Sequence, residues 1–283
     1  MKVVVSGAGG MLAHALVPLL RARGHETVAL DRAELDVADE TAVHRRIAAE
    51  RPHAVVQCAA YTAVDRAEAE EAEATRINGA AAGFVADACD RVGAAFVYPS
   101  TDYVFAGTAT VPYRPGDPTD PVNAYGRSKL AGERATLASE RGLVVRTSWL
   151  YGAGGSHFVD TILRLAREGK PLRVVDDQWG RPTWTGALAA ALAALMESGA
   201  RGIFHATGGG EPVSWCGFAR EVVALAAPGA EVAAVTSAEF PRPARRPAWS
   251  VLDCSTTEER TGARLPHWRD SLVGYLESSG AGA

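Results

Sequence analysis

A glycine-rich turn between a β-branched strand and a helix opens the chain, and this feature constrains the fold most. Residues 2–5 form an apolar run, which is typical of a strand buried on both faces of a sheet. Gly7, Gly10 and the small Ala13 then precede a helix-like segment over residues 12–24. Such glycines allow a tight turn and a close approach to a pyrophosphate, and the helix N-terminus favours an anion. This context predicts a dinucleotide-binding unit.

Strands and helices alternate along the first half of the sequence. Four further apolar runs of strand type lie at residues 27–30, 54–57, 95–98 and 143–146. The alternation predicts an α/β fold, a Rossmann-type doubly wound parallel sheet, over residues 1–152. The looser pattern over residues 153–278 predicts a smaller C-terminal α/β substrate-binding region, from which later segments can return to the first domain. Residues 279–283 are expected to form a flexible tail.

Side chains suited to binding or catalysis follow the predicted strands. Sheets of this kind bind ligands beyond the carboxyl ends of their strands. An acid about 20 residues after the glycines typically binds the adenosine ribose of NAD, whereas an adjacent Arg can bind the 2′-phosphate of NADP. With Asp31 and Arg32 side by side, the sequence does not decide between NADH and NADPH as the cofactor. Asp31 could also simply be a turn-forming acid.

Tyr125 and Lys129 lie four residues apart in a segment of helical character, so both are expected on one helix face. A neighbouring ammonium lowers the pKa of a tyrosine, ordinarily about 10, which predicts an acid–base unit. A hydroxyl from Ser100 or Thr101 could steady the oxygen that is protonated. Such pairs also occur on solvated helices, but this chain uses Arg almost everywhere, and a Lys here suggests a need for an amine.

Composition argues against several other classes of protein. A net charge of −4 without Lys/Arg runs argues against a nucleic-acid-binding protein. The apolar runs are shorter than the about 20 residues that span a bilayer, and no charged-then-apolar leader opens the sequence. The four cysteines have no CxxC spacing and the seven histidines no HxxxH or HExxH spacing. We therefore expect reduced thiols, a cytoplasmic protein and no protein-built zinc site.

Two charged clusters have more than one interpretation. Five acids crowd residues 65–73, ahead of a helix expected to continue to about Val92. We favour carboxylates at a helix N-terminus, where the dipole stabilises them, over a metal site. A Pro/Arg-rich stretch over residues 240–249, together with Arg181, is compatible with a nucleotide-diphosphate site or with solvated turns.

Seven stretches in a fixed order form a specific signature. They are GAGGML (7–12), AAYTAVDRAE (59–68), YPSTDYVFAGT (98–108), NAYGRSKLAGE (123–133), RTSWLYG (146–152), DQWGRPT (177–183) and PARRPAWSVLD (243–253). With them the chain resembles the extended short-chain dehydrogenase/reductases, and among these the dTDP-4-dehydrorhamnose reductase family, over nearly its whole length. Ala13 replaces a common third glycine, Tyr61 stands where His is frequent, and Pro99 stands where an aromatic residue is common.

The resemblance implies reduction of the C4 keto group of dTDP-4-dehydro-L-rhamnose by NADPH or NADH, giving dTDP-L-rhamnose. It implies that Tyr125 gives the proton, that Lys129 holds the nicotinamide ribose and that Thr101 hydrogen-bonds the carbonyl oxygen. The implied cofactor contacts are Gly7, Gly10, Met11, Leu12, Asp31, Arg32, Asp36, Val37, Ala60, Tyr61, Thr62, Tyr125 and Lys129. The implied substrate contacts are Val64, Thr101, Asp102, Tyr125, Trp149 and Arg181. No metal is expected, and a homodimer is compatible with the resemblance.

Three alternative functions are considered. The same chemistry on another dTDP-4-keto-6-deoxy sugar of antibiotic or glycan biosynthesis is a close alternative, which residues around Trp149 and Arg181 would decide. A 4,6-dehydratase is disfavoured. Enzymes of that kind resemble this scaffold but typically have an acid–base Asp-Glu pair after the Thr, whereas here Asp102 is followed by Tyr103. A non-catalytic NAD(P)-binding regulatory subunit, like the beta subunit of methionine adenosyltransferase, is disfavoured by the intact Thr101, Tyr125 and Lys129.

Overall fold

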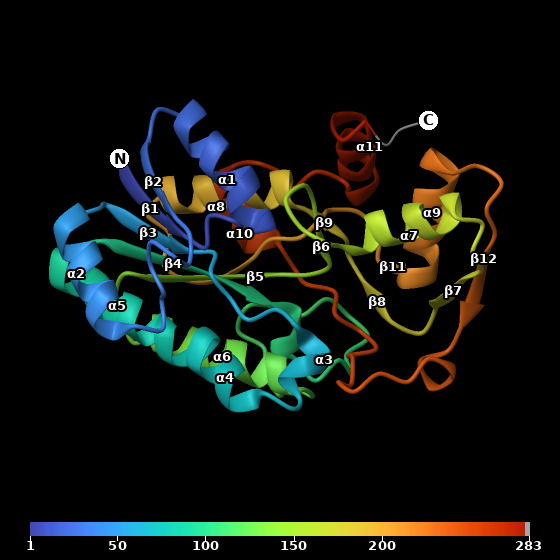
Figure 1. Cartoon of the computed structure of the whole chain (residues 1–283), viewed down its shortest axis with the longest axis horizontal. Coiled ribbons are helices and arrows are strands. Elements are labelled where there is room, and N and C mark those ends of the chain that lie inside the picture. The colour runs from blue at the N-terminus through green and yellow to red at the C-terminus, as the bar shows by residue number, and fades with distance from the viewer. Residues whose placement is uncertain (281–283) are drawn as a thin grey trace.

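A six-stranded parallel sheet forms the centre of the computed structural model, which describes residues 1–280 (Figure 1). Its strands are β1 (Lys2–Ser6), β2 (Glu26–Leu30), β3 (Ala54–Gln57), β4 (Ala95–Thr101), β5 (Gly142–Thr147) and β10 (Gly202–His205), in the order β10-β5-β4-β3-β1-β2. The chain moves outward from β1 to β2 and then continues on the other side of β1 with β3. The strand order thus reverses between β1 and β3, and the predicted doubly wound parallel sheet is confirmed.

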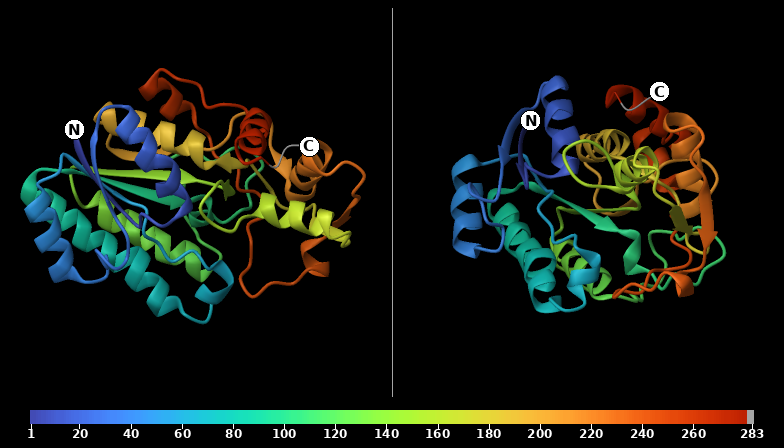
Figure 2. Two further views of the ribbon diagram at one scale, coloured as in Figure 1. Left: turned by 45° about the horizontal axis from the view of Figure 1, so that its top comes forward. Right: turned by 45° about the vertical axis from the view of Figure 1, so that its right-hand side comes forward.

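Helices cover both faces of this sheet (Figures 1 and 2). One face carries α1 (Met11–Ala22), α8 (Thr185–Glu197) and α10 (Ser255–Thr261), and the other carries α2 (Glu40–Glu50), α5 (Ala81–Val92) and α6 (Ala124–Leu137). Successive side chains of a strand point to opposite faces. Val3 and Val5 accordingly pack in the core beneath α1 and α8, whereas Val4 packs in the core beneath α2 and α5. The β-branched run is apolar because both of its faces are buried.

The C-terminal region adds three short strand pairs and its own aromatic-rich core. Its elements are β6 (Leu150–Tyr151), α7 (Phe158–Arg167), β7 (Leu172–Val175), β8 (Trp179–Gly180), β9 (Thr183–Trp184), β11 (Val213–Ser214), α9 (Trp215–Ala226), β12 (Val232–Val235), η3 (Ser237–Glu239) and α11 (Trp268–Ser278). Between them, α8 and β10 return to the central sheet, so the division at residue 152 stays a prediction. The expected tail follows α11, and residues 281–283 of it lie outside the described residues. Within residues 1–280, no helix has the length and apolar character needed to cross a bilayer.

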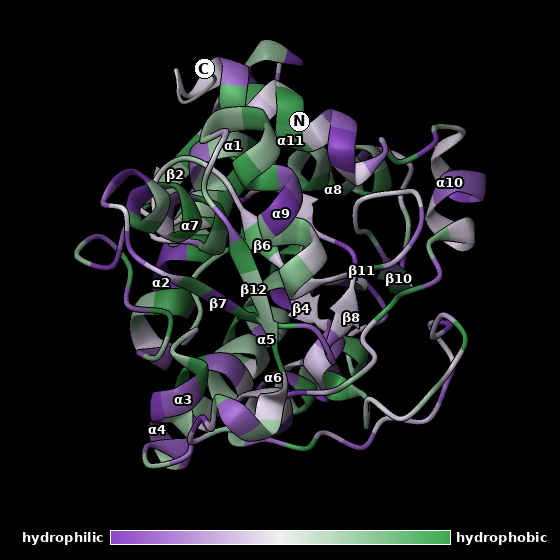
Figure 3. Ribbon diagram, turned by 90° about the vertical axis from the view of Figure 1, so that its right-hand side faces the viewer, coloured by the Kyte–Doolittle hydropathy of each residue, from purple (hydrophilic) through white to green (hydrophobic). Residues whose placement is uncertain are grey.

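The acid-rich segment begins with the short α3, and after a turn the expected helix runs without a break from Glu71 to Val92, with one π-helical turn inside it. It forms α3 (Val64–Ala67), α4 (Glu71–Thr75) and the π-helical turn η1 (Arg76–Ala80) before α5 begins. The first two are strongly hydrophilic (Figure 3). A π-helical turn inside a helix is often found at a functional site, and here it contains the buried Asn78.

Candidate active site

The reversal of strand order between β1 and β3 borders a cavity of about 490 Å³. Seven of the expected cofactor residues line it, namely Gly7, Gly10, Asp31, Arg32, Asp36, Val37 and Ala60. This is where doubly wound sheets bind dinucleotides, because the connections leave the sheet in opposite directions and open a crevice. The sequence therefore predicted most of the lining of this cavity.

The N-terminus of α1 borders the cavity. Its N-cap is Gly10, and none of the described residues caps it with a side chain or places an acid in its first turn. By contrast, Asp39 caps α2, Asn123 caps α6 and Ser214 caps α9. Free N–H groups and the positive end of the helix dipole favour an anion. The uncapped end fits the diphosphate of a dinucleotide.

Gly7→Ala is expected to lower the free energy of unfolding by about 1–3 kcal/mol, the usual cost of a strained backbone. Gly7 has a φ of +71°, and a Cβ there would lie 2.4 Å from the backbone nitrogen of Ala59. Urea unfolding measures the change. Gly9→Ala is the matched control, because a Cβ at Gly9 meets nothing within 4 Å. Equal losses in both variants would contradict this account of the turn.

The loop after β2 presents Asp31 and Arg32 at the edge of the same cavity. Asp31 Oδ1 accepts hydrogen bonds from the N–H groups of Ala33 at 2.8 Å and Glu34 at 3.0 Å, so Asp31 does form a turn. The Arg32 side chain is 78% exposed. Both residues remain accessible for a ribose or a 2′-phosphate, and their contact with a cofactor stays a prediction.

A second cavity of about 490 Å³ adjoins the first, and the two share Gly10, Cys58 and Ala60 in their walls. It brings together nine residues expected at the site: Met11, Leu12, Thr62, Val64, Thr101, Asp102, Tyr125, Lys129 and Trp149. They come from α1, the loop after β3, the end of β4, α6 and the end of β5. The two cavities are neighbours with shared wall residues, and we call them together the catalytic cleft.

The start of α6 is held against the end of β4, and this places Tyr125 in the catalytic cleft. The side chain of Asn123 caps the helix by accepting from the Gly126 N–H at 2.8 Å. A Cβ on Gly126 would lie 2.2 Å from the carbonyl oxygen of Tyr103, so only glycine allows this approach. Tyr125 and Lys129 line the same cavity, as their spacing predicted.

Of the two candidate hydroxyls at the end of β4, Thr101 is the one that faces Tyr125. Thr101 and Tyr125 line the same cavity, and the Thr101 hydroxyl donates to Asp102 Oδ1 at 2.9 Å. The Ser100 hydroxyl donates instead to Glu133, in the buried interior behind the strand. Ser100 and Thr101 differ in this way because successive side chains of a strand point to opposite faces of the sheet.

Lys129 is buried, with 3% of the residue exposed. Its amine donates a 2.8 Å hydrogen bond to the carbonyl oxygen of Pro99 and lies 3.8 Å from the centroid of the Tyr98 ring. Burial lowers the pKa of Lys129 to about 7, against the opposing charges of Glu133 and Cys58. The amine is therefore anchored by the backbone of β4 at the base of the catalytic cleft.

The pKa of Tyr125 corrects one expectation. Burial raises this pKa above its ordinary value, Asp102 raises it further, and the neighbouring Thr101 opposes the rise. The predicted lowering by Lys129 is wrong for this structure, because the amine is directed to the Pro99 carbonyl. Tyr125 thus holds its proton, which is the form that a general acid needs.

Asn78 is a buried anchor of the site that the sequence did not single out. Its side chain accepts from the Tyr61 N–H at 2.9 Å and donates to the Tyr61 carbonyl at 3.0 Å. It also donates to the Ser128 hydroxyl at 2.9 Å, which in turn donates to the Tyr125 carbonyl at 2.7 Å. Asn78 therefore links the loop after β3 to the turn of α6 that carries Tyr125. The sequence did contain one indication of this role, which is an Asn within a segment of helical pattern. Asn is unfavourable inside helices because its side chain competes for backbone hydrogen bonds.

Trp149 and Trp215 form an aromatic wall on the C-terminal side of the catalytic cleft. Their rings are stacked with centroids 3.6 Å apart and planes 7° apart. Trp149 has a φ of +49°, which is uncommon for a residue other than glycine. A Cβ on Gly180 would lie 2.6 Å from the Trp149 ring, so a glycine is needed for β8 to approach the ring this closely. The sequence pointed to Trp149 and missed Trp215.

Two residues expected at the site do not line the catalytic cleft. The Tyr61 hydroxyl donates to Glu70 at 2.7 Å, although its backbone is held by Asn78. The Arg181 guanidinium donates to the Leu252 carbonyl at 3.1 Å. Both side chains face other parts of the protein, so the geometry does not support their predicted contacts.

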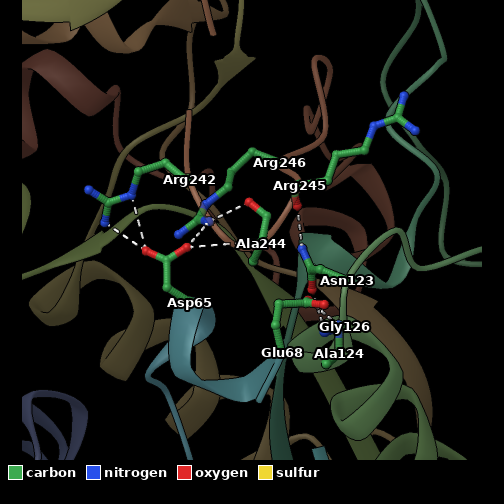
Figure 4. Close-up of polar contacts among 9 residues, drawn as sticks. All are labelled: Asp65, Glu68, Asn123, Ala124, Gly126, Arg242, Ala244, Arg245 and Arg246. Atoms are coloured by element: carbon green, nitrogen blue, oxygen red, sulfur yellow. Dashed lines mark hydrogen bonds and ion pairs between the residues drawn. The ribbon is translucent and has the colours of Figure 1, made fainter. Parts of the chain in front are cut away.

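The Pro/Arg-rich segment of residues 240–249, which we call the strap, is fastened to α3 by Asp65 (Figure 4). Arg242 donates to Asp65 at 2.7 and 3.1 Å, and Arg246 forms a close ion pair with it. The N–H of Ala244 adds a bond of 3.2 Å. Two of the arginines considered for a diphosphate site are therefore engaged by a carboxylate of the protein itself.

The strap also contacts the start of α6 (Figure 4). Asn123 donates to the Arg245 carbonyl at 2.8 Å, while Glu68 accepts from the Ala124 N–H at 2.8 Å. The Arg245 side chain is exposed and makes no hydrogen bond or ion pair with the described part of the chain. Most acids of the 65–73 cluster thus have specific partners. Across residues 1–280, no group of three or more His, Cys, Asp or Glu side chains is arranged to hold a metal ion.

Asp65→Asn is expected to remove a stability contribution that depends on pH. Burial raises the pKa of Asp65, but hydrogen bonds from Arg246 and Ala244 outweigh it and lower the pKa to about 2. An unfolded Asp has a pKa of about 3.9. The contribution, about 2–3 kcal/mol, is therefore complete above pH ~4 and is lost as the pH falls through about 2.

Urea unfolding between pH ~5 and ~2 tests this. Asp65→Asn should lack the loss of stability that the parent protein shows as the pH falls. Glu73→Gln is the control, because its pair with Arg76 is 42–43% exposed and worth little. An unchanged slope in Asp65→Asn would contradict the expected role of the strap contact.

Comparison with known proteins identifies relatives over nearly the whole chain. The family model described as the RmlD substrate binding domain matches residues 1–280. A dTDP-4-dehydrorhamnose reductase of Streptomyces griseus is 46% identical over 95% of this chain and 91% of its own. A dTDP-4-keto-6-deoxy-D-glucose reductase of Streptomyces niveus is 41% identical over 95% of this chain and 94% of its own.

A solved structure extends the likeness to the whole fold. It is that of dTDP-4-dehydrorhamnose reductase from Bacillus anthracis in complex with NADP, which is 34% identical, covers 98% of this chain and 99% of its own, and gives a TM-score of 0.95. The resemblance seen in the motifs is confirmed. The chain belongs to the RmlD substrate-binding-domain family, together with the dTDP-4-dehydrorhamnose reductases.

Proposed function

We propose that this protein is an NAD(P)H-dependent oxidoreductase that reduces the C4 keto group of dTDP-4-dehydro-L-rhamnose to give dTDP-L-rhamnose. The observation that carries the proposal is that Thr101, Tyr125 and Lys129 line the second cavity, which shares wall residues with the cavity at the uncapped end of α1. The reductase names of the relatives support the same reaction class, and NADP in the Bacillus anthracis structure supports the cofactor.

The first cavity has the groups that a nicotinamide dinucleotide needs. The backbone N–H groups at the start of α1 would hold its diphosphate. Asp31 or Arg32 would contact the adenosine ribose there, and Lys129, which lines the adjoining second cavity, would contact the nicotinamide ribose. When bound, the reduced nicotinamide supplies the hydride that C4 receives.

The second cavity has the groups that handle the substrate. Thr101 would hydrogen-bond the C4 carbonyl oxygen, and Tyr125, whose raised pKa keeps it protonated, would donate the proton. The stacked Trp149 and Trp215 form an apolar wall for the deoxysugar. Arg245 is the free guanidinium of the strap, so it is our candidate for the substrate diphosphate.

Turnover of defined sugars tests the proposal. Purified protein is incubated with dTDP-4-dehydro-L-rhamnose and NADPH or NADH, and cofactor oxidation is compared with the product mass. One cofactor should be oxidised for each sugar that gains two hydrogens. A higher kcat/KM for dTDP-4-keto-6-deoxy-D-glucose, the substrate named for the Streptomyces niveus relative, would instead support the alternative sugar. Cofactor binding without reduction of any such sugar would support a regulatory subunit.

We also propose a cytoplasmic location. The four cysteines are unpaired and three of them are buried, as suits a reducing compartment. Light scattering of the purified protein would measure whether it forms the homodimer that the resemblance allows.

A further inference from the structure

Trp215 brings an aromatic ring into the catalytic cleft from the C-terminal region. It is the first residue of α9, whereas its stacking partner Trp149 follows β5 of the central sheet. The wall formed by the two rings therefore has one part in each region of the protein. Because the ring centroids are 3.6 Å apart and the planes are nearly parallel, Trp215 covers one face of Trp149, and a ligand can reach only the rest of the pair.

Two short antiparallel strands fix both rings. In the pair of β8 and β11, Gly180 lies opposite Val213. Gly180 lies against the Trp149 ring, and β11 ends directly before Trp215. The Trp215 N–H also donates to the Gln178 carbonyl, just before β8, at 3.3 Å. The positions of the two rings are thus set by the same pair of strands.

Trp149 depends on its neighbours for its orientation. A φ of +49° is uncommon for a large residue, and such a backbone persists only where the surrounding contacts enforce it. Trp215 supplies a contact of this kind across one ring face. Trp215 is in turn packed against Phe158 of α7, with ring centroids 4.5 Å apart, and against the C-terminal core. The stack is therefore anchored in the C-terminal region.

The second cavity has polar and apolar parts. Thr101, Asp102 and Tyr125 supply hydroxyl and carboxyl groups, whereas Trp149 and Trp215 supply indole rings. In the proposed substrate, C4 carries the keto oxygen, C3 carries a hydroxyl group and C5 carries a methyl group. With the C4 oxygen at Thr101 and Tyr125, this methyl group is the neighbouring substituent that cannot form a hydrogen bond. The aromatic pair offers it an apolar surface.

We propose that Trp215 is a specificity-determining residue, which together with Trp149 packs against the C6 methyl group of the sugar and rejects a sugar with a hydroxyl group on C6. This rests on the proposed function and goes beyond it, because it states which feature of the sugar the protein selects. A C6 hydroxyl against the two rings would lose its water without gaining a hydrogen-bond partner. Apolar pockets reject an added hydroxyl by about 10²-fold, so selection of that size is expected.

The sugar nucleotides dTDP-L-rhamnose and dTDP-L-mannose test the selection, because they differ only in the hydroxyl group on C6. Both can be assayed in the direction of oxidation with NADP⁺ or NAD⁺, which passes through the same transition state. The parent protein should have a kcat/KM about 10²-fold higher for dTDP-L-rhamnose. In Trp215→Ala this ratio should fall below about 10, because water can then solvate the C6 hydroxyl. Trp215→Phe keeps an aromatic ring at this position and should retain most of the ratio.

Trp184→Ala is the matched control. Trp184 is half-buried and packs against the C-terminal core, but it lines neither cavity of the catalytic cleft. This variant also loses an indole ring and should keep the parent ratio between the two sugars. A ratio that falls equally in Trp184→Ala and Trp215→Ala would indicate a general loosening of the core and would overturn the proposal.

Circular dichroism and binding give readouts that do not depend on turnover. Two indole rings in contact couple their electronic transitions and produce a paired band in the far ultraviolet. The band should be present in the parent and in Trp184→Ala and absent in Trp215→Ala. Binding of dTDP-L-rhamnose should change the band, whereas dTDP, which has no sugar, should leave it unchanged. Trp215→Ala should bind dTDP as tightly as the parent and dTDP-L-rhamnose about 4-fold more weakly, the effect of one methyl group returned to water.

The proposal fails if the parent handles the two sugars equally, or if their ratio is unchanged in Trp215→Ala. It also fails if dTDP-L-rhamnose binds without changing the paired band, since the sugar would then lie away from the stack. The measurements on the parent remain decisive if Trp215→Ala does not fold. Binding of cofactor and dTDP-L-rhamnose without oxidation of either sugar would instead overturn the proposed function, and the relative affinities for the two sugars would still test Trp215.

Discussion

Tyr125→Phe is expected to lower kcat by about 10²–10⁴-fold, the usual contribution of a general acid. The substitution removes the hydroxyl and leaves the ring in place beside Thr101 in the catalytic cleft. The cofactor cavity is lined by other residues, so the affinity for NADPH or NADH should change little. Steady-state kinetics with the dTDP-sugar gives kcat, and fluorescence titration gives the cofactor affinity.

Tyr275→Phe controls for the loss of a buried tyrosine hydroxyl. Its hydroxyl lies 3.0 Å from Asp160, in the C-terminal core and outside the catalytic cleft. This variant should lose some stability and keep its kcat. If Tyr125→Phe turns over at the parent rate, the proton must come from elsewhere, and the assignment of Tyr125 fails even though the fold and family stand.

The sheet and its cofactor cavity could be predicted from the sequence because they depend on the local pattern of apolar and polar residues. β1, β3, β4 and β5 contain apolar runs that are buried on both faces, whereas the edge strand β2 is only partly buried. Helices separate the first five strands along the chain. The residue after each run falls at one edge of the sheet as a consequence of parallel pairing. Gly7, Asp31 and Thr101 could therefore be assigned to one edge before any coordinates.

Contacts between distant segments were not readable in this way. The helix expected up to Val92 forms, but it contains a π-helical turn at Asn78, whose side chain bonds to Tyr61 and Ser128, 17 and 50 residues away. The strap is held by Asp65, 177 residues before Arg242. Pairings of this kind depend on the completed fold, and no local spacing encodes them.

The spacing of Tyr125 and Lys129 predicted the position of the site correctly but predicted the wrong direction for the pKa shift of Tyr125. Helix geometry brings the two side chains to one face whatever surrounds them. Their pKa values depend instead on burial and on what accepts the lysine protons, which is the carbonyl of Pro99 on β4. The positions of the two side chains could therefore be predicted from the sequence, whereas their pKa values depend on the packing of the site.

Behind the catalytic residues, Glu133 and Arg146 form a buried ion pair. Arg146 donates to Glu133 at 2.7 and 2.9 Å, and their side chains are only 2% and 1% exposed. Arg146 also donates to the Pro115 carbonyl at 3.1 Å, and Ser100 donates to Glu133. The pair thus connects β5 and the long loop before α6 to the strand and helix that carry Thr101 and Lys129. Burial and Arg146 lower the pKa of the adjacent His205 to about 3.

Arg146→Met is expected to lower the free energy of unfolding by about 3–5 kcal/mol, because Glu133 is left as an unpaired charge in the interior. Glu133→Met should cost a similar amount by leaving Arg146 unpaired. The double variant should cost clearly less than the sum, since two matched apolar side chains leave no buried charge. Urea unfolding of the four proteins completes the cycle.

Arg76→Met provides the comparison for this cycle, because its pair with Glu73 is exposed and should contribute at most about 1 kcal/mol. Additive losses in the double variant would contradict the charge argument and point to lost packing alone. The distinction matters for the site as well. If the loss is electrostatic, the apolar double variant should recover stability without recovering kcat, because Ser100 then has no acceptor and the end of β4 is no longer fixed.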